Sequence, residues 1–223
     1  MLLLLLLCAG RAQAQAGIRA GMNFATLSTA NGEGLYRDAR ASGKVGWQLG
    51  VLYQRPLARR WLLVPELQYS CQRQELQVVD NSVSDGSYAG HYALTLGYLT
   101  VPMWARAAFG RAYLEVGPQL GLLVNAHETG TETIGSIVGG RTLAVDRPAA
   151  DRYTRADIAL GIGGGVQLSN DWSISLRITT GLCSLTDEYT APYNYGGGLR
   201  SQVAQLSLNY QLKKPAVGKP DRK

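Results

Sequence analysis

The feature that most constrains this chain is a period-two alternation of apolar and polar residues that recurs eight times after residue 16. In the segment 112–126, for example, Leu114 and Val116 share one face while Glu115 and Gln119 share the other. Successive side chains of a β-strand point to opposite faces, so this pattern predicts strands. No apolar run after residue 16 is long enough to cross a bilayer as a helix, which needs about 20 residues. We therefore expect an all-β protein.

Eight segments share the alternation, and each reaches the ~9–11 residues that a tilted strand needs to cross a bilayer. They are residues 17–28, 45–55, 61–79, 92–109, 112–126, 153–168, 172–185 and 199–212. No charged residue falls on any of the eight apolar faces. A Lys or Arg that faces lipid at the bilayer midplane costs ~2–4 kcal/mol, so a face without charged residues is what contact with lipid requires.

The opposite faces are polar and glycine-rich, and they carry both signs of charge. Four positive and three negative side chains lie on them, namely Arg19, Glu66, Arg106, Glu115, Arg155, Asp157 and Arg177. A nearly balanced set suits a closed lumen, because charges that are removed from water must pair. We expect these seven residues to form a polar network in the lumen.

The connections between the eight segments alternate in length. Residues 56–60, 110–111 and 169–171 are short, whereas 29–44, 80–91, 127–152 and 186–198 are long, polar and glycine-rich. Short periplasmic turns and long extracellular loops are typical of an eight-stranded antiparallel up-and-down transmembrane β-barrel, which is the predicted fold. A soluble exported barrel is the alternative, since alternation alone does not say which face lies inside.

Aromatic residues gather beside the short connections, where the aromatic girdle of such a barrel is expected. The predicted girdle consists of Trp61, Trp104, Phe109, Trp172 and Tyr210.

The short connections also predict a register. A two-residue turn at Gly110-Arg111 places Arg106 opposite Glu115, with both side chains in the lumen, so a salt bridge is expected. The same counting gives three further pairs: Phe109 with Ala112, Arg55 with Trp61, and Leu168 with Trp172.

The two ends of the chain differ from its middle. Residues 1–16 contain an apolar run and two Ala-x-Ala sites, which indicates a signal peptide. Residues 213–223 carry a charge of +4 of the total +6 and are expected to be a disordered tail. The barrel itself, residues 17–212, is then nearly neutral, and no nucleic-acid partner is expected.

Five sequence blocks resemble, in order, those of the PorT-like or outer membrane β-barrel family of Bacteroidota. They are Gly17-Ile-Arg-Ala-Gly-Met-Asn-Phe24, Val64-Pro-Glu-Leu-Gln-Tyr-Ser70, Tyr98-Leu-Thr-Val-Pro-Met103, Tyr113-Leu-Glu-Val-Gly-Pro-Gln-Leu-Gly121 and Leu206-Ser-Leu-Asn-Tyr210. The resemblance covers residues 17–212. It implies an outer-membrane barrel that contacts outer-membrane lipid and is inserted by the barrel assembly machinery, with some members linked to protein secretion. Such barrels usually end on an aromatic residue, whereas here Gln211, Leu212 and the basic tail follow Tyr210.

Three groups of residues are candidates for sites of chemistry. The glycine run Gly161–Gly165 lacks the context of a phosphate loop and predicts instead strand kinks beside bulky lumen side chains. The pair His127-Glu128, with Ser136 nearby in sequence, is a candidate acid–base site. The loop residues Asp80, Asp85, Asp187 and Glu188 show no metal-ligand spacing. We expect no metal, no cofactor and no catalytic residue.

A tyrosine-rich loop is the remaining candidate surface. Tyr189, Tyr193 and Tyr195 are expected either to bind a secretion or surface protein partner or to anchor the rim. The function expected from the sequence is therefore a non-enzymatic outer-membrane barrel with a lumen filled by side chains, which presents surface loops. The alternative is a small lipid-modifying or proteolytic barrel enzyme with its site at the long-loop rim.

Overall fold

The protein consists almost entirely of β-strands. The structure, a computed structural model, describes residues 15–29, 37–80, 86–136, 139–183 and 199–212. Its elements in chain order are β1 (Gln15–Thr29), β2 (Arg37–Pro56), β3 (Trp61–Asp80), β4 (Gly86–Phe109), β5 (Ala112–Ser136), β6 (Gly139–Pro148), the 3₁₀ turn η1 (Ala150–Arg152), β7 (Ala156–Gln167), β8 (Trp172–Gly181) and β9 (Leu199–Gln211). Within these ranges, no helix has the length and apolar character needed to cross a membrane.

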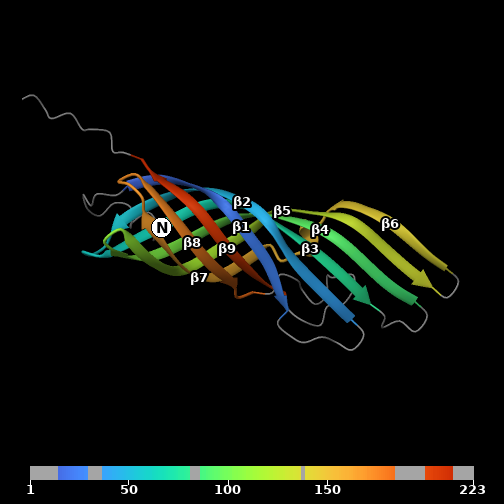
Figure 1. Cartoon of the computed structure of the whole chain (residues 1–223). Helices are drawn as coiled ribbons and strands as arrows, with labels where there is room; N and C mark the ends of the chain where they lie inside the picture. Colours follow the sequence, from blue (N-terminus) through green and yellow to red (C-terminus); the bar gives the residue numbers. More distant parts are fainter. Residues whose placement is uncertain (1–14, 30–36, 81–85, 137–138, 184–198, 213–223) are drawn as a thin grey trace, which may run out of the picture.

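Eight of the strands close into a ring. The order is β4-β3-β2-β1-β9-β8-β7-β5, every neighbouring pair is antiparallel, and β4 pairs with β5 to complete the cylinder (Figure 1). The eight-stranded up-and-down barrel predicted from the sequence is confirmed. Closure removes free strand edges from the barrel wall, so the backbone groups there are satisfied between neighbouring strands.

The uncharged apolar faces of the strands point outward and the polar faces point into the barrel, as predicted from the sequence. Leu120 and Leu176 point outward and are 57% and 56% exposed, whereas Arg19 and Arg177 point inward and are 1% and 0% exposed. This is the reverse of a soluble barrel, in which the apolar set would be enclosed. The soluble alternative is therefore wrong for the described strands.

Three of the four long connections, 29–44, 80–91 and 127–152, contain strand in their described residues, which corrects the sequence-based prediction. The residues 127–152 were expected to be a loop, but β5 continues through them to Ser136 and pairs with a ninth strand, β6. Similarly, β3 and β4 remain paired to Asp80 and Tyr88. These segments are rich in Thr, Gly and Glu, so they lack the apolar stripe on which the strand prediction relied.

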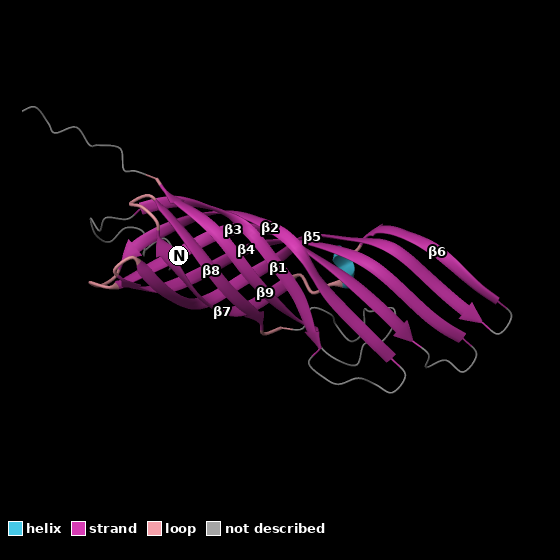
Figure 2. Ribbon diagram, in the orientation of Figure 1, coloured by secondary structure: helices cyan, strands magenta, loops and turns pink. Residues whose placement is uncertain are grey.

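The ends of β2, β3, β4 and β5 that lie away from the short turns form, together with β6, a sheet that projects beyond the ring, as Figure 2 shows. We call it the extension: residues 37–44 of β2, 73–80 of β3, 86–96 of β4, 126–136 of β5, and β6. The outward apolar band ends at Leu99 and Val124, and above them Thr95, His127 and Thr129 take the outward positions. The extension thus begins where the hydrocarbon-facing surface stops.

Two β-bulges mark the junction between the barrel and the extension. The β2–β3 register shifts between Lys44 and Trp47, and the β4–β5 register shifts at Gly97 and Tyr98, where β5 carries one extra residue, Val124. A bulge bends its strand and increases the local twist. The bulges therefore redirect these strands as they leave the closed wall.

Most of the predicted register is found. Arg106 pairs with Glu115 and Phe109 pairs with Ala112. The Leu168 amide donates to the Trp172 carbonyl at 2.8 Å, next to the paired Gln167 and Ser173. These three pairs are confirmed.

The fourth pair is wrong. Arg55 lies opposite Leu63 instead of Trp61, because the Leu57 and Ala58 amides both donate to the Trp61 carbonyl and close a tighter turn. The error is two residues, so it leaves every side chain on its predicted face.

The glycines of β7 lie beside bulky lumen side chains, as predicted, but the pairing of β7 with β5 and β8 shows no shift of register at the predicted kinks. A Cβ atom at Gly161 would lie 2.6 Å from the Trp104 ring, and one at Gly163 would lie 2.7 Å from the Arg177 Cγ atom. A Cβ atom at Gly165 would overlap the Tyr113 ring. The β7 wall is thus thin where the interior is most crowded.

Candidate functional site

Five charged side chains from five strands meet inside the barrel. They are Arg19 of β1, Glu66 of β3, Arg106 of β4, Glu115 of β5 and Arg177 of β8, and all are at most 4% exposed. We call them the ionic cluster. They alternate with the outward apolar residues of their strands, which is why the sequence places them on one face.

Arg177 is the centre of the ionic cluster. Its Nη1 and Nη2 atoms donate to the two oxygens of Glu66 at 2.8 and 2.7 Å, and its Nε atom donates to Glu115 Oε1 at 2.5 Å. One guanidinium thus joins two carboxylates from different strands. A fork of this kind is the strongest geometry available to an arginine.

The two other arginines complete the ionic cluster. Arg106 donates through Nε and Nη2 to Glu115 Oε2 at 3.1 and 3.0 Å, so the salt bridge predicted from the turn is present. Arg19 donates through Nη1 to both Glu66 oxygens at 3.2 Å and through Nη2 to Ser175 Oγ at 2.7 Å. The Gln68 amide also donates to Glu66. Every carboxylate of the cluster therefore has several donors.

Two aromatic rings cover the guanidinium groups. The Arg177 Cζ atom lies 4.2 Å from the Trp104 ring centre, and the Arg106 Cζ atom lies 4.0 Å from the Tyr113 ring centre. The assignment of Trp104 to the aromatic girdle is wrong, because its ring is fully buried in the barrel. Trp104 shares the inward face of β4 with Arg106, and the same alternation that placed Arg106 applies to it.

The other predicted girdle residues lie at the short-turn end. Trp61, Phe109 and Trp172 are 50%, 54% and 42% exposed, and Tyr210 packs on Trp172 with ring centres 4.8 Å apart.

Two members of the predicted polar network do not join the ionic cluster. Arg155 is exposed and donates to Asp151 at 2.8 Å, so its assignment to the lumen is wrong. It precedes β7, which begins only at Ala156, and the alternation does not extend to it. Asp157 points inward in β7, but its buried Oδ1 atom has no hydrogen-bond partner among the described residues.

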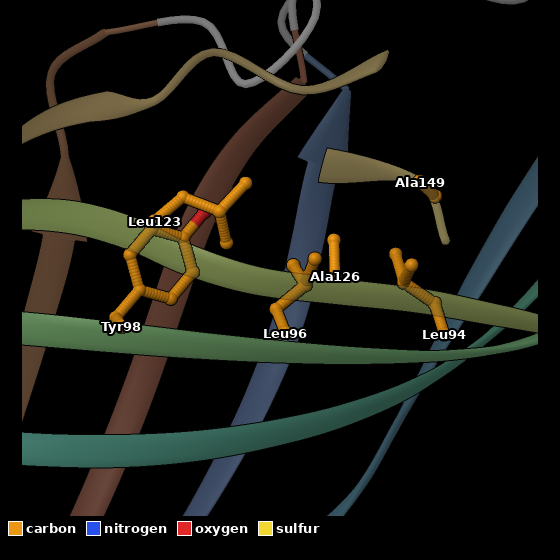
Figure 3. Close-up of a cluster of buried hydrophobic side chains, with 6 residues drawn as sticks. All are labelled: Leu94, Leu96, Tyr98, Leu123, Ala126 and Ala149. Atoms are coloured by element: carbon orange, nitrogen blue, oxygen red, sulfur yellow. The ribbon is translucent and has the colours of Figure 1, made fainter. Parts of the chain in front are cut away.

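Apolar side chains fill the barrel above and beside the ionic cluster. At the mouth, Leu94, Leu96 and Tyr98 of β4 pack with Leu123, Ala126 and Ala149 (Figure 3). Beside the ionic cluster, Leu52 and Val64 pack with Trp104. An eight-stranded barrel has an interior just wide enough for side chains to fill, and here they occupy several successive layers.

A second polar group lies on the inner face of the extension. Glu132 Oε1 accepts hydrogen bonds of 2.8 Å from Tyr92 and from Arg147 Nη2. Glu128 accepts a hydrogen bond of 3.1 Å from Arg147 Nε and one of 2.9 Å from the Tyr153 hydroxyl. We call these five residues the extension cluster. It ties β6 and the segment after it to β4 and β5.

The extension cluster shifts two ionisation equilibria. Burial, with hydrogen bonds to Tyr88 and Glu132, raises the pKa of Tyr92. Burial lowers the pKa of Arg147, but the hydrogen bonds that it donates to Glu132 and Glu128, with their negative charges, outweigh burial, so this pKa is raised overall. Both shifts favour the protonated forms that these contacts require.

Sequence reasoning missed the extension cluster. Glu128, Gly130 and Glu132 alternate with threonines, and Val145 and Arg147 keep the same period in β6. This polar period-two pattern around the glycines was the available indication of a hairpin.

The candidate acid–base residues do not form a catalytic group in the described structure. His127 Nε2 lies 2.7 Å from Asp146 Oδ1 on the exposed outer face of the extension. Ser136 lies nine residues further along the same strand, or about 30 Å at the usual rise per residue. Thr95 is opposite His127, yet the described side chains show a hydrogen bond from His127 to Asp146 alone.

The remaining candidate residues lie largely outside the described residues. This applies to Tyr189, Tyr193 and Tyr195, and to Asp85, Asp187 and Glu188, while Asp80 ends β3. No group of three or more His, Cys, Asp or Glu side chains that could hold a metal occurs in the described ranges.

One comparison with known proteins, the family model, agrees with the fold. The family model described as outer membrane protein beta-barrel domain matches residues 11–187. No curated protein sequence matches the chain.

Several solved structures resemble the chain over almost their whole length. The attachment invasion locus protein Ail of Yersinia pestis is 12% identical with a TM-score of 0.42, and the match covers 89% of this chain and 99% of that one. OprG from Pseudomonas aeruginosa is 12% identical with a TM-score of 0.42 and coverages of 92% and 99%. Neisserial surface protein A is 9% identical with a TM-score of 0.41 and coverages of 89% and 99%. Likeness at this level carries no information on function.

Proposed function

For this chain, which belongs to the outer membrane protein beta-barrel domain family and lies in the outer membrane, we propose the role of a non-conducting, non-catalytic anchor. In this proposal, the barrel holds the extension outside the membrane as a docking surface for another macromolecule. The orientation follows from the barrel plan, in which short turns face the periplasm and the long connections face outward.

The observation that carries the proposal is the filled interior. Arg19, Glu66 and Arg177 join β1, β3 and β8 across the lumen by hydrogen bonds. Apolar packing of Leu94, Leu96 and Leu123 then occupies the mouth. An ion would have to displace both layers, and the carboxylates and guanidinium groups it would separate are already paired.

Conductance of the folded protein in planar bilayers tests this part of the proposal. We expect no stepwise conductance from protein whose folding is verified by its heat-modifiable migration on gels. A variant with alanine at Arg19, Glu66, Glu115 and Arg177 is expected to conduct or to lose its fold, while Arg155→Ala stays silent and folded. Stable open-channel steps from the folded wild type would overturn the anchor proposal.

The length of the strands in the extension, and the ion pairs that hold them together, support the extension as the docking surface. Strands β4 and β5 have 24 and 25 residues, more than twice the ~9–11 that cross a bilayer. The ion pairs of Arg147 with Glu128 and Glu132 hold β6 on β5. A braced sheet presents a preformed surface and loses little conformational entropy when a partner binds.

Register-matched deletions can remove most of the extension while keeping the barrel. Glu75 pairs with Ala93, and Thr129 pairs with Asp146, so residues 76–92 and 130–145 can each be replaced by a two-residue turn. The trimmed barrel is expected to insert and migrate as a folded protein but to lose the macromolecule that copurifies with the full chain. If both forms retain the same macromolecule equally, the extension is not the docking surface.

A narrower role as an accessory of protein secretion rests on the sequence resemblance to PorT-like barrels. Deletion of the protein is then expected to reduce the set of secreted proteins, and the full chain but not the trimmed barrel should restore it. An unchanged secreted set after deletion would remove this narrower role and leave the anchor proposal intact.

A further inference from the structure

The outer wall of the barrel carries an apolar groove near the short turns. It has a volume of about 1030 Å³ and crosses the outward face of β4, β5, β7 and β8. At its centre Gly164 pairs with Leu114 on one side and with Leu176 on the other. Gly164 has no side chain while both neighbours are large, so the floor of the groove lies at the level of the backbone.

The groove lies in one half of the membrane. Trp61, Phe109 and Ala112 line the end beside the short turns, and Val116 lies four residues further along β5 from Ala112. Four residues span about 13 Å of strand, against about 30 Å for the hydrocarbon core. The groove therefore faces the leaflet on the short-turn, periplasmic side.

Two exposed arginines stand at the open end of the groove. Arg60 directly precedes Trp61, and Arg111 directly precedes Ala112. The Ala108 amide donates to the Arg60 carbonyl at 2.8 Å, and the Gln167 amide donates to the Arg111 carbonyl at 2.8 Å. Their backbones are thus fixed to the wall that forms the groove, at the depth where lipid head groups begin.

We propose that this groove binds one anionic phospholipid of the periplasmic leaflet. One acyl chain lies over Gly164 between Leu114 and Leu176, and the phosphate lies between Arg60 and Arg111. Arginine binds phosphate through a planar fork of donors, which suits this head group. The three short turns beside the groove carry Arg59, Arg60 and Arg111 against Asp171, and this excess of positive charge favours a lipid of net negative charge over a zwitterionic one.

Retention of lipid by the purified barrel tests the proposal. The folded protein in detergent is mixed with equal amounts of phosphatidylglycerol and phosphatidylcholine, and native mass spectrometry counts the bound lipid. We expect one phosphatidylglycerol to be retained in preference. The double variant Arg60→Gln/Arg111→Gln should lower its retention by about fivefold or more for each arginine removed.

Matched controls separate the groove from general charge and general apolar contact. Arg73→Gln/Arg141→Gln removes the same charge from the extension and should leave retention unchanged. Ala107→Leu narrows the groove and should lower retention, whereas Ala20→Leu makes the same change on the outward face of β1 and should not. Heat-modifiable migration verifies that each variant is folded.

Three results would overturn the lipid site. They are equal retention of both lipids, an equal loss in the two double-arginine variants, and unchanged retention in Ala107→Leu. Conductance and partner binding play no part in this experiment, so its failure leaves the anchor proposal standing.

Discussion

Arg106 and Glu115 lie directly opposite each other on β4 and β5, and an ion pair of 3.0 Å joins them inside the barrel. Glu115 does not belong to Arg106 alone, since Arg177 donates to its other oxygen at 2.5 Å. An exchange of Arg106 and Glu115 therefore changes the contact with Arg177 as well as the contact between the two residues.

The double variant Arg106→Glu/Glu115→Arg is expected to be no more stable than Arg106→Glu alone. The new arginine at position 115 would face Arg177, so one contact is restored while another becomes repulsive. Urea unfolding in lipid vesicles, followed by heat-modifiable migration, measures this. Recovery of wild-type stability would mean that the pair acts independently of Arg177.

Replacement of Arg177 by methionine is expected to cost about 3–5 kcal/mol of unfolding free energy, because it leaves Glu66 and Glu115 without their shared partner in a buried site. Arg155→Gln is the matched control, since the exposed Arg155–Asp151 pair contributes little. The same unfolding assay compares the two. A loss below about 1 kcal/mol in Arg177→Met would contradict the central role of Arg177.

Single-tryptophan variants test the orientation of the barrel wall. Brominated lipid is expected to quench Trp61 and Trp172, which point outward, and to leave Trp104 unquenched among the lumen side chains. Fluorescence at increasing mole fractions of brominated lipid is the measurement. Equal quenching of Trp104 and Trp61 would place the wrong face of β4 in the lumen.

The β5–β6 hairpin can be tested by cysteine pairs. Thr133 and Thr142 are cross-strand partners with hydroxyl groups 3.1 Å apart, so Thr133→Cys/Thr142→Cys should form a disulfide on mild oxidation. Ala144 pairs with Thr131 instead, and Thr133→Cys/Ala144→Cys should form one much more slowly. Single-cysteine variants control for reaction with Cys71 or Cys183. A reversed preference would show a different register for β6.

The extension is expected to loosen in alkali. Because burial and hydrogen bonds raise the pKa of Tyr92 above its unfolded value near 10, its stabilising contribution is complete below about pH 10 and declines as the pH rises further. Limited proteolysis of the extension should become faster above pH 10 in the wild type. Tyr92→Phe should lack this part of the pH dependence, and an identical profile in both forms would assign the effect to other groups.

The sequence by itself determined which residues of a strand share a face, and the absence of charge from one face favoured a membrane barrel over a soluble one. Strand alternation is a local property with a fixed period of two, so Leu120 and Arg177 could be placed without knowledge of any neighbour. The two-residue turn also fixed the pairing of Arg106 with Glu115, because a tight hairpin leaves one register.

The tertiary structure alone decided which charges meet and how far the strands continue. The sequence placed seven charges on one predicted face, but only the closed ring brought Arg177 between Glu66 and Glu115, and Arg155 lies before the start of β7 and is exposed. Strand β6 exists because β5 offers it a paired edge and Arg147 finds Glu128 and Glu132 across that edge. Such contacts join residues through space, and a polar segment carries no apolar stripe that reveals them in advance.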